Sequence, residues 1–432
     1  FRSYEERSLG IDNVMDGIRL KYRPTAGLTI KSFFGTQRFF FEQGPGIVRG
    51  IDAELNLNES FKGLNNSKTN ILLGAGFISR FQESSNPVYN LPENVGAYSV
   101  RSTINRGKIS FNSEYAYKYN DPDGGVTYNN YAPGNAIMSN MSYSERGLGI
   151  IVEAHRVDNM DFRSARGVTG NELTLAYIPA ITKQHTYTLA AFYPFSTQPM
   201  GELGFLGELN YNIKKKSALG GKYGALLTVN YSRVNALNGG NSVLTENESH
   251  TPIFFSVIGE DLYFRDFNME LKKKLSKKAK LTTSYVDMIY NKDVVQGKNV
   301  GKDIHARIGI VELNYKLKPK HTIRTELQYL SVDKDEKYDE DSGDWMMALV
   351  EYTFAPHWYF AVVDQYNDGY TDYEQVVHEA VHYLNISCGY SSGTNRFELG
   401  YGKKREGIFC VGGVCKNVPS SNGFTFGITS SF

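Results

Sequence analysis

Period-two alternation between apolar and polar side chains recurs along the whole chain, and this feature most limits the fold. In residues 51–57, Ile, Ala, Leu and Leu alternate with Asp, Glu and Asn, and similar alternation returns at 223–232 and 397–401. Successive side chains of a β-strand point to opposite faces, so this period is typical of strands with two different faces. Helical periodicity is nearly absent, and an all-β fold is therefore predicted.

Alternation also fits a soluble β-sandwich or propeller, and the connections between the predicted strands separate these folds. Short turns alternate with long loops, which is typical of outer-membrane barrels, with their short periplasmic turns and longer external loops. The short turns are predicted at residues 23–27, 105–107, 145–147, 276–278 and 318–320, and the long loops at 82–95, 120–133, 234–260, 333–344 and 367–375.

The C-terminal stretch gives the second distinguishing feature. Phe424, Phe426, Ile428 and Phe432 share one face of a predicted last strand, and Phe432 is the last residue of the sequence. This pattern resembles the terminal signal strand of bacterial outer-membrane barrels, which the barrel-assembly machinery recognises. We therefore predict that these four residues form the assembly signal.

The bulk composition agrees with a barrel although it looks soluble. Charged residues make up 22% of the chain and the mean hydropathy is −0.39, values that are typical of soluble proteins. A membrane barrel can have the same averages, because only alternate residues of a spanning strand face lipid. No run of 18 or more apolar residues exists, so no spanning helix is predicted. With a net charge of +1, nothing in the sequence suggests the clustered basic face that nucleic-acid binding would need. The prediction is one barrel over residues 1–432, in the bacterial outer membrane.

About 20 residues for each strand with its connection predict roughly twenty-one strands. Single-chain bacterial barrels have even strand numbers, and the turn at 23–27 is predicted to be periplasmic. The first strand would then enter from outside, so a preceding strand is expected. We predict a large antiparallel barrel of about 22 or more strands, with N-terminal strands and an export signal preceding Phe1.

Several stretches carry a resemblance to a known group of proteins. They are residues 1–7 with 10–13, 182–187, 220–224 and 410–432. They resemble an uncharacterised family of outer-membrane barrels from Bacteroidota-type bacteria. The resemblance implies the same fold and location, with the first stretch internal to a longer chain. It implies no activity, because the family carries none that can be transferred.

Charged side chains on the polar faces are the candidate functional residues. A polar, charge-lined channel is one interpretation, and a salt-bridged wall under a plug is the other. Their mixed signs argue against strong ion selectivity, since rings of one charge usually select. The predicted lumen-lining set is Arg101, Glu114, Lys118, Glu208, Glu270, Lys272, Arg324, Glu326, Arg396 and Glu398.

Two stretches, one with two histidines and one rich in acidic residues, are considered as metal sites. His378-Glu379-Ala380-Val381-His382 matches the H-E-x-x-H zinc motif, which requires a helix. Its surroundings predict a strand, on which the two histidines lie about 13 Å apart and cannot share one zinc. The acidic residues of 333–344 lack EF-hand spacing and are interpreted as a solvated loop. No metal and no cofactor are predicted.

The three cysteines lie close to the C-terminus. Cys410 and Cys415 lie in a predicted Gly-rich external loop, and a disulfide between them is the first interpretation, with free thiols as the alternative. Cys388 is interpreted as an unpaired filler on its strand.

Three functions remain from the sequence. The first is porin-like passage of small polar solutes, and the second is a non-conducting structural or accessory subunit of a larger outer-membrane complex. The third, an enzyme, lacks a convincing nucleophile–base pair, and no enzymatic activity is predicted. Expected partners are outer-membrane lipid and lipopolysaccharide, the barrel-assembly machinery during biogenesis, and other outer-membrane proteins.

Overall fold

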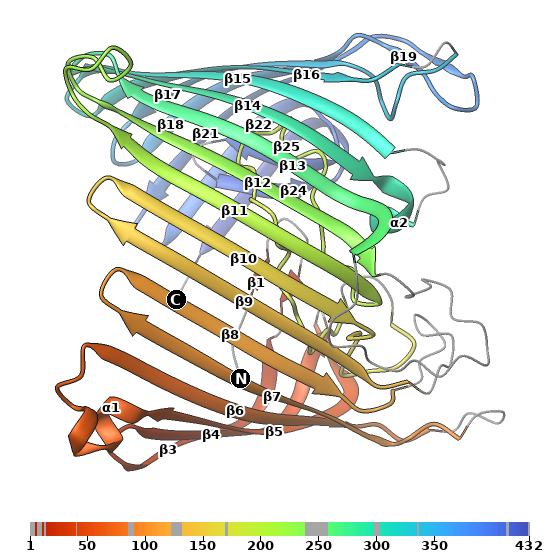
Figure 1. The fold of residues 1–432 in the computed structure, drawn as a ribbon. Coiled ribbons are helices and arrows are strands. Elements are labelled where there is room, and N and C mark those ends of the chain that lie inside the picture. The colour runs from red at the N-terminus through yellow and green to blue at the C-terminus, as the bar shows by residue number, and fades with distance from the viewer. Residues whose placement is uncertain are drawn as a thin grey trace. The chain divides into compact units, whose positions relative to one another are not determined.

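Alternating sequence becomes long paired strands in the computed structural model (Figure 1). Residues 5–6, 11–12, 14–39, 41–84, 90–121, 132–168, 172–237, 258–297, 303–334, 337–411 and 414–430 are described. Within these ranges, nineteen strands belong to one closed barrel, so the predicted all-β barrel is confirmed. The chain divides into two compact units, the first with residues 1–181, 196–207 and 233–262, and the second with 182–195, 208–232 and 263–432.

Unit 1 is a run of consecutive antiparallel hairpins. Its strands are β3 (Met15–Thr25), β4 (Leu28–Phe39), β5 (Glu42–Asn56), β6 (Thr69–Phe81), β7 (Asn94–Arg106), β8 (Ile109–Lys118), β9 (Gly134–Glu145) and β10 (Leu148–Asp158). Two short helical turns, α1 (Leu57–Ser60) and η1 (Lys62–Leu64), connect β5 to β6, and the short strands β1 (Glu5–Glu6) and β2 (Ile11–Asp12) pair with each other.

Three strands contribute residues to both units. They are β11 (Gly201–Ile213), β12 (Ala225–Leu237) and β13 (Ile258–Lys274).

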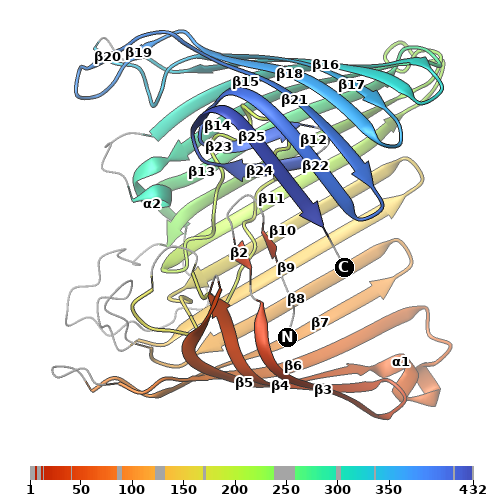
Figure 2. The same ribbon diagram turned by 180° about the vertical axis from the view of Figure 1, so that it is seen from behind.

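Unit 2 continues the same hairpin pattern. Its barrel strands are β14 (Ala279–Asn291), β15 (Asp303–Lys318), β16 (His321–Val332), β17 (Trp345–Phe354), β18 (Trp358–Asn367), β21 (Val381–Ser392), β22 (Asn395–Lys404) and β25 (Ser421–Ser430). The connections carry helix α2 (Lys292–Gln296) and two small hairpins, β19 (Tyr370–Thr371) with β20 (Val377–His378), and β23 (Gly407–Val411) with β24 (Val414–Val418). Figure 2 shows these hairpins from behind.

All five predicted short turns are tight connections between antiparallel strands. Ala26-Gly27 joins β3 to β4 and Arg146-Gly147 joins β9 to β10. Gly27 has φ +79° and Gly147 has φ +87°, a backbone region that costs a side-chain-bearing residue free energy. Glycine at these positions therefore fixes the turns, and the turns fix the strand register.

The two faces of each strand differ as the alternation predicts. In unit 2, Leu327, Val350 and Ile386 are each more than half exposed on one face. Their neighbours Glu326 and Leu349 on the other face are buried. We call the exposed apolar face the outer face and the opposite one the inner face.

The strand number differs from the prediction of about 22 or more. Residues 159–200, between β10 and β11, form no barrel strand among the described positions. At about 20 residues for each strand with its connection, this stretch accounts for two of the roughly twenty-one strands that length predicts. The N-terminal strands expected before Phe1 stay a prediction.

Candidate functional site

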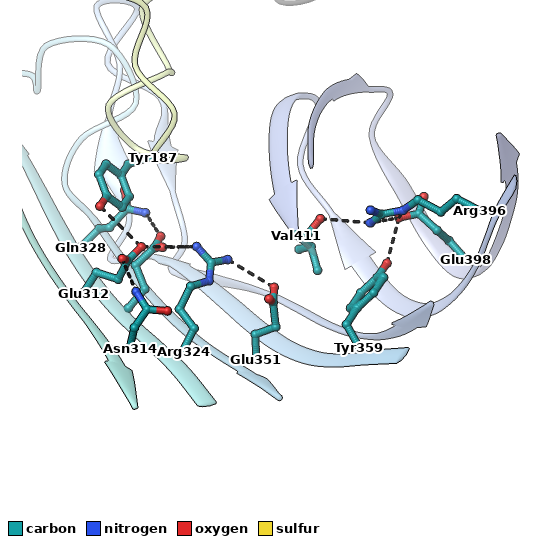
Figure 3. Close-up of polar contacts among 11 residues, drawn as sticks. Tyr187, Glu312, Asn314, Arg324, Gln328, Glu351, Tyr359, Arg396, Glu398 and Val411 are labelled. Carbon is teal, nitrogen blue, oxygen red and sulfur yellow. Dashed lines mark hydrogen bonds and ion pairs between the residues drawn. The ribbon is translucent and has the colours of Figure 1, made fainter. Parts of the chain in front are cut away.

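The inner face of unit 2 carries a compact group of charges, which we call the Arg324 cluster (Figure 3). The Arg324 guanidinium lies 3.0 Å from a Glu326 carboxylate oxygen, 3.3 Å from Glu351 and 3.5 Å from Glu312. Alternation on β15, β16 and β17 turns these side chains to one face, and antiparallel pairing puts Arg324 opposite Glu351. One cation therefore faces three carboxylates.

A second charged group lies on β18 and β22 of the same unit. Arg396 contacts Glu398 at 2.8 Å, and the Tyr359 hydroxyl donates to Glu398 at 2.8 Å. Arg396 also donates to the carbonyl of Val411 at 3.4 Å, so the β23–β24 hairpin folds back over this part of the inner face (Figure 3). Arg396 and Glu398 are each less than one-fifth exposed.

Residues 182–195, part of the connection between β10 and β11, cover the inner face of unit 2. We call this stretch the inner segment. Polar bonds fix residues 183–189 of this segment to strands β13, β15 and β16. Lys183 donates to Asn268 at 2.9 Å, and His185 lies 2.7 Å from Asp266. Tyr187 lies 3.5 Å from Glu312 of the Arg324 cluster. The Leu189 backbone N–H donates to the Gln328 side chain at 2.9 Å.

The second half of the inner segment is held by aromatic side chains, of which Tyr193 and Phe195 are buried. Phe195 packs on Phe264 with ring centroids 5.1 Å apart, and Phe192 packs on Trp345 at 5.3 Å. The Tyr193 hydroxyl donates to Asp341 at 3.2 Å. Burial raises the pKa of Tyr193 well above its ordinary value, so the hydroxyl stays a donor.

In unit 1, residues 159–181 of the same connection lie against the inner face. Lys118 is fully buried and donates to the Asp161 carbonyl at 2.8 Å. Arg80, also fully buried, binds Asp121 and the Arg163 carbonyl. Phe162 packs with the buried side chains of β7. Buried charge is retained here because each group has a partner.

The ten predicted lumen residues do not form one site. Arg324 with Glu326, Arg396 with Glu398, and Lys272 with Glu270 are contacting pairs. The remaining four residues contact other groups. Arg101 binds Asp52 and Glu54, Lys118 donates to the Asp161 carbonyl, and Glu208 accepts from Asn210. Glu114 and Arg101 both line a pocket of about 400 Å³.

Sequence reasoning missed the connection 159–200 and its barrel contacts. Asp52, Glu312 and Glu351 follow the same alternation as the predicted residues and were open to the same argument. The connection gave a weaker signal, because it lacks sustained alternation and contains Pro179, Pro194 and Pro199. Those features predict irregular backbone and do not show which strands it contacts.

The histidine motif is not helical, as predicted, but it is divided between two strands of different sheets, with Glu379 and Ala380 between them, so the single predicted strand is wrong. His378 lies on β20 and bonds Asp372 at 2.9 Å, whereas His382 lies on β21 and bonds Asp364 at 2.8 Å. Within the described ranges, no group of three His, Cys, Asp or Glu side chains is placed to hold a metal ion.

The three cysteines and three of the four predicted assembly residues lie on strands. Cys410 of β23 is the cross-strand partner of Cys415 of β24, and the disulfide between them stays a prediction. Cys388 is a free thiol on β21. The predicted assembly residues Phe424, Phe426 and Ile428 are exposed on the outer face of β25, and Phe432 lies outside the described residues.

The outer face is an apolar surface in both units. In unit 1, Ile18, Leu20, Ile51 and Val100 are at least half exposed, and unit 2 exposes Leu327, Val350, Ile386 and Leu399 likewise. In the described parts of the chain, no helix is long and apolar enough to cross a membrane. A barrel pairs its backbone groups internally, and an apolar outer face suits hydrocarbon.

Residues 1–432 match the family described as "Family of unknown function (DUF6029)". The chain belongs to this family. The closed barrel and the apolar outer face make this DUF6029 protein a transmembrane β-barrel, which is the architecture of bacterial outer-membrane proteins. The link of this family to Bacteroidota stays a prediction. A search of curated proteins gave no match.

Solved structures similar to this DUF6029 chain are themselves barrels. One is the siderophore receptor PirA from Pseudomonas aeruginosa, with 13% identity over 96% of this chain and 69% of that one, at a TM-score of 0.41. Another is OpdK from the same organism with vanillate, with 11% identity over 88% and 92% and a TM-score of 0.40. OccAB3 from Acinetobacter baumannii has 9% identity over 88% and 92% and a TM-score of 0.36. At these low scores, the similarity implies no substrate or activity for the DUF6029 protein.

Proposed function

We propose that this protein passes small polar solutes through a narrow route lined by the inner face. The main support is that the Arg324 cluster stays partly exposed beside the inner segment. The exposed fraction is 22% for the Arg324 side chain and 13% for the Glu312 side chain. Charged side chains on a lumen wall keep it hydrated, and a folded-in segment narrows the route. The wall would set size and charge preference without catalysis.

Conductance of the purified protein in planar lipid bilayers tests this proposal. We expect small, discrete current steps, below those of a wide open pore, because the inner segment and the β23–β24 hairpin occupy the inner face of unit 2. Absence of current from correctly folded protein, verified by heat-dependent gel mobility, would contradict it.

A second candidate function has its own support. Leu189 and Ala190 of the inner segment are fully buried, and Phe195 is nearly so, which favours a filled interior and a structural subunit of a larger outer-membrane complex. Such a barrel would give no current and would copurify with other outer-membrane proteins after mild detergent extraction. Under either function, the proposed partners are lipid, lipopolysaccharide and the barrel-assembly machinery. An origin in Bacteroidota is proposed as well.

A further inference from the structure

Unit 2 contains a pocket that the proposed passage does not use. It has a volume of about 670 Å³ and is formed by the connections β14–β15, β16–β17, β18–β21 and β22–β23 together with the adjacent strand ends. Volumes of about 300–1,000 Å³ are typical of small-molecule sites. These connections belong to the same end of the strands as the predicted external loops, so the pocket would meet solutes outside the cell.

Five aromatic side chains line the pocket: Tyr338, Trp345, Tyr370, Tyr373 and Tyr383. Trp345 is nearly buried and packs on Tyr383 with ring centroids 5.8 Å apart. The chain's own cations already lie on two of these rings, with Arg405 at 5.3 Å from the Trp345 centroid and Lys403 at 4.7 Å from that of Tyr383. These two rings therefore already stabilise cations that belong to the chain itself.

The charge of the pocket lining is strongly one-sided. Seven carboxylates face one lysine and one arginine. Internal bonds fix part of this wall: Asp339 contacts Lys334 at 3.1 Å, and Asp372 contacts His378 at 2.9 Å. The hydrogen bond from His378 lowers the pKa of Asp372, which keeps this carboxylate ionised.

Glu379 and Glu406 are exposed residues of the lining and can meet a ligand directly. A cleft lined by one sign of charge raises the local concentration of the opposite charge. Aromatic rings beside carboxylates are the chemistry that recognises alkylammonium groups. The seven carboxylates would repel an anion, and their charge would not attract a neutral sugar.

We propose that this pocket binds a small organic cation, an alkylammonium or guanidinium group carried on an apolar body. The aromatic walls receive the apolar body, and the rim carboxylates supply the charge opposite to that of the cation. The binding does not require the barrel to conduct, so it stands apart from the proposed passage.

Tryptophan fluorescence tests the proposal, because the chain has two tryptophans and only one lines the pocket. Trp358 lies on the outer face, and a Trp358→Phe variant leaves Trp345 as the sole reporter. The full chain in detergent is titrated with choline chloride, with sodium chloride at equal ionic strength and the uncharged isostere 3,3-dimethyl-1-butanol as controls. We expect a saturable change with choline alone. An equal change with the uncharged isostere or with glucose, or no change with choline, would overturn the proposal.

Matched glutamate substitutions test the role of the rim. A Glu379→Gln, Glu406→Gln double variant in the Trp358→Phe background is expected to weaken choline binding about two- to fivefold per charge removed. Glu374→Gln removes an exposed carboxylate of the same β18–β21 connection that does not line the pocket, and it should leave the affinity unchanged. Equal effects of the two changes would mean that general surface charge, rather than this pocket, attracts the cation.

Discussion

Arg324 is the cation of the Arg324 cluster on the inner face of unit 2. Its guanidinium is the cation shared by Glu312, Glu326 and Glu351, all on the inner face. Glu326 and Glu351 are nearly buried, so water screens their charges less than it screens surface carboxylates. Removing the cation leaves three carboxylates beside the route that we propose.

Arg324→Gln is therefore expected to increase the preference of the channel for cations over anions. The reversal potential under a salt gradient measures this preference, and a severalfold change in the permeability ratio is expected. Arg307→Gln is the matched control, because Arg307 lies half exposed on the outer-facing side of neighbouring β15. If both variants shift the reversal potential alike, the Arg324 cluster does not line the route.

The cross-strand cysteines give a second residue-scale prediction. Cys410 and Cys415 occupy directly opposite positions of the β23–β24 hairpin, where a disulfide would lock the fold-back over Arg396. We expect alkylation without reductant to label Cys388 alone and alkylation after reduction to label all three cysteines. Mass spectrometry counts the labels, and three labels without reductant would contradict the disulfide.

At the scale of elements, the inner segment covers part of the inner face of unit 2. It is tied to β16 through the bond from the Leu189 backbone N–H to Gln328, and both partners are buried. A buried N–H without an acceptor costs about 1–3 kcal/mol, so this single bond matters to the covered state.

Gln328→Ala is expected to loosen the inner segment. Limited proteolysis should then cut within residues 182–195 several times faster, and mean conductance should rise. Leu327→Ala, a change on the outer face of the same strand, should alter neither measurement. Unchanged proteolysis in Gln328→Ala would show that the aromatic contacts hold the segment without this bond.

Strand β25 is the element predicted to direct assembly. Phe426 is 70% exposed on its outer face, whereas Thr425 is the inner-face partner of Gly400. Phe426→Ser combined with deletion of Phe432 should lower the folded protein in outer-membrane fractions severalfold, with Thr425→Ala near the wild-type level. Equal yields for both would place the signal elsewhere.

At the scale of the whole molecule, the apolar outer face governs where the protein can exist. Contiguous apolar surface on a soluble monomer rarely exceeds a few hundred Å², and the exposed aliphatic and aromatic residues here recur on strand after strand. A lipid or detergent belt must cover this surface, because water cannot solvate it without a large free-energy cost.

Dilution of detergent below its micelle-forming concentration should therefore aggregate the folded protein, while dichroism before dilution shows strands. Light scattering measures the aggregation, and addition of detergent before dilution is the control. A monomer that persists in plain buffer would contradict the lipid-facing assignment.

The sequence by itself determined the strand-forming stretches outside residues 159–200, the short turns and the two faces of the strands. Alternation places Arg324 and Glu326 on one face and Leu327 on the other, and Gly27 and Gly147 mark tight turns, because strand period and backbone stereochemistry are local properties. The ten charged candidates follow from the same local rule.

Only the tertiary structure decided what those faces contact. Local pattern cannot show that residues 182–195 leave the strand series and bond Asn268, Asp266 and Gln328, or that four connections form one pocket. Such contacts join residues 80 or more positions apart, and their free energy depends on burial and partner geometry that exist only after the strands have paired.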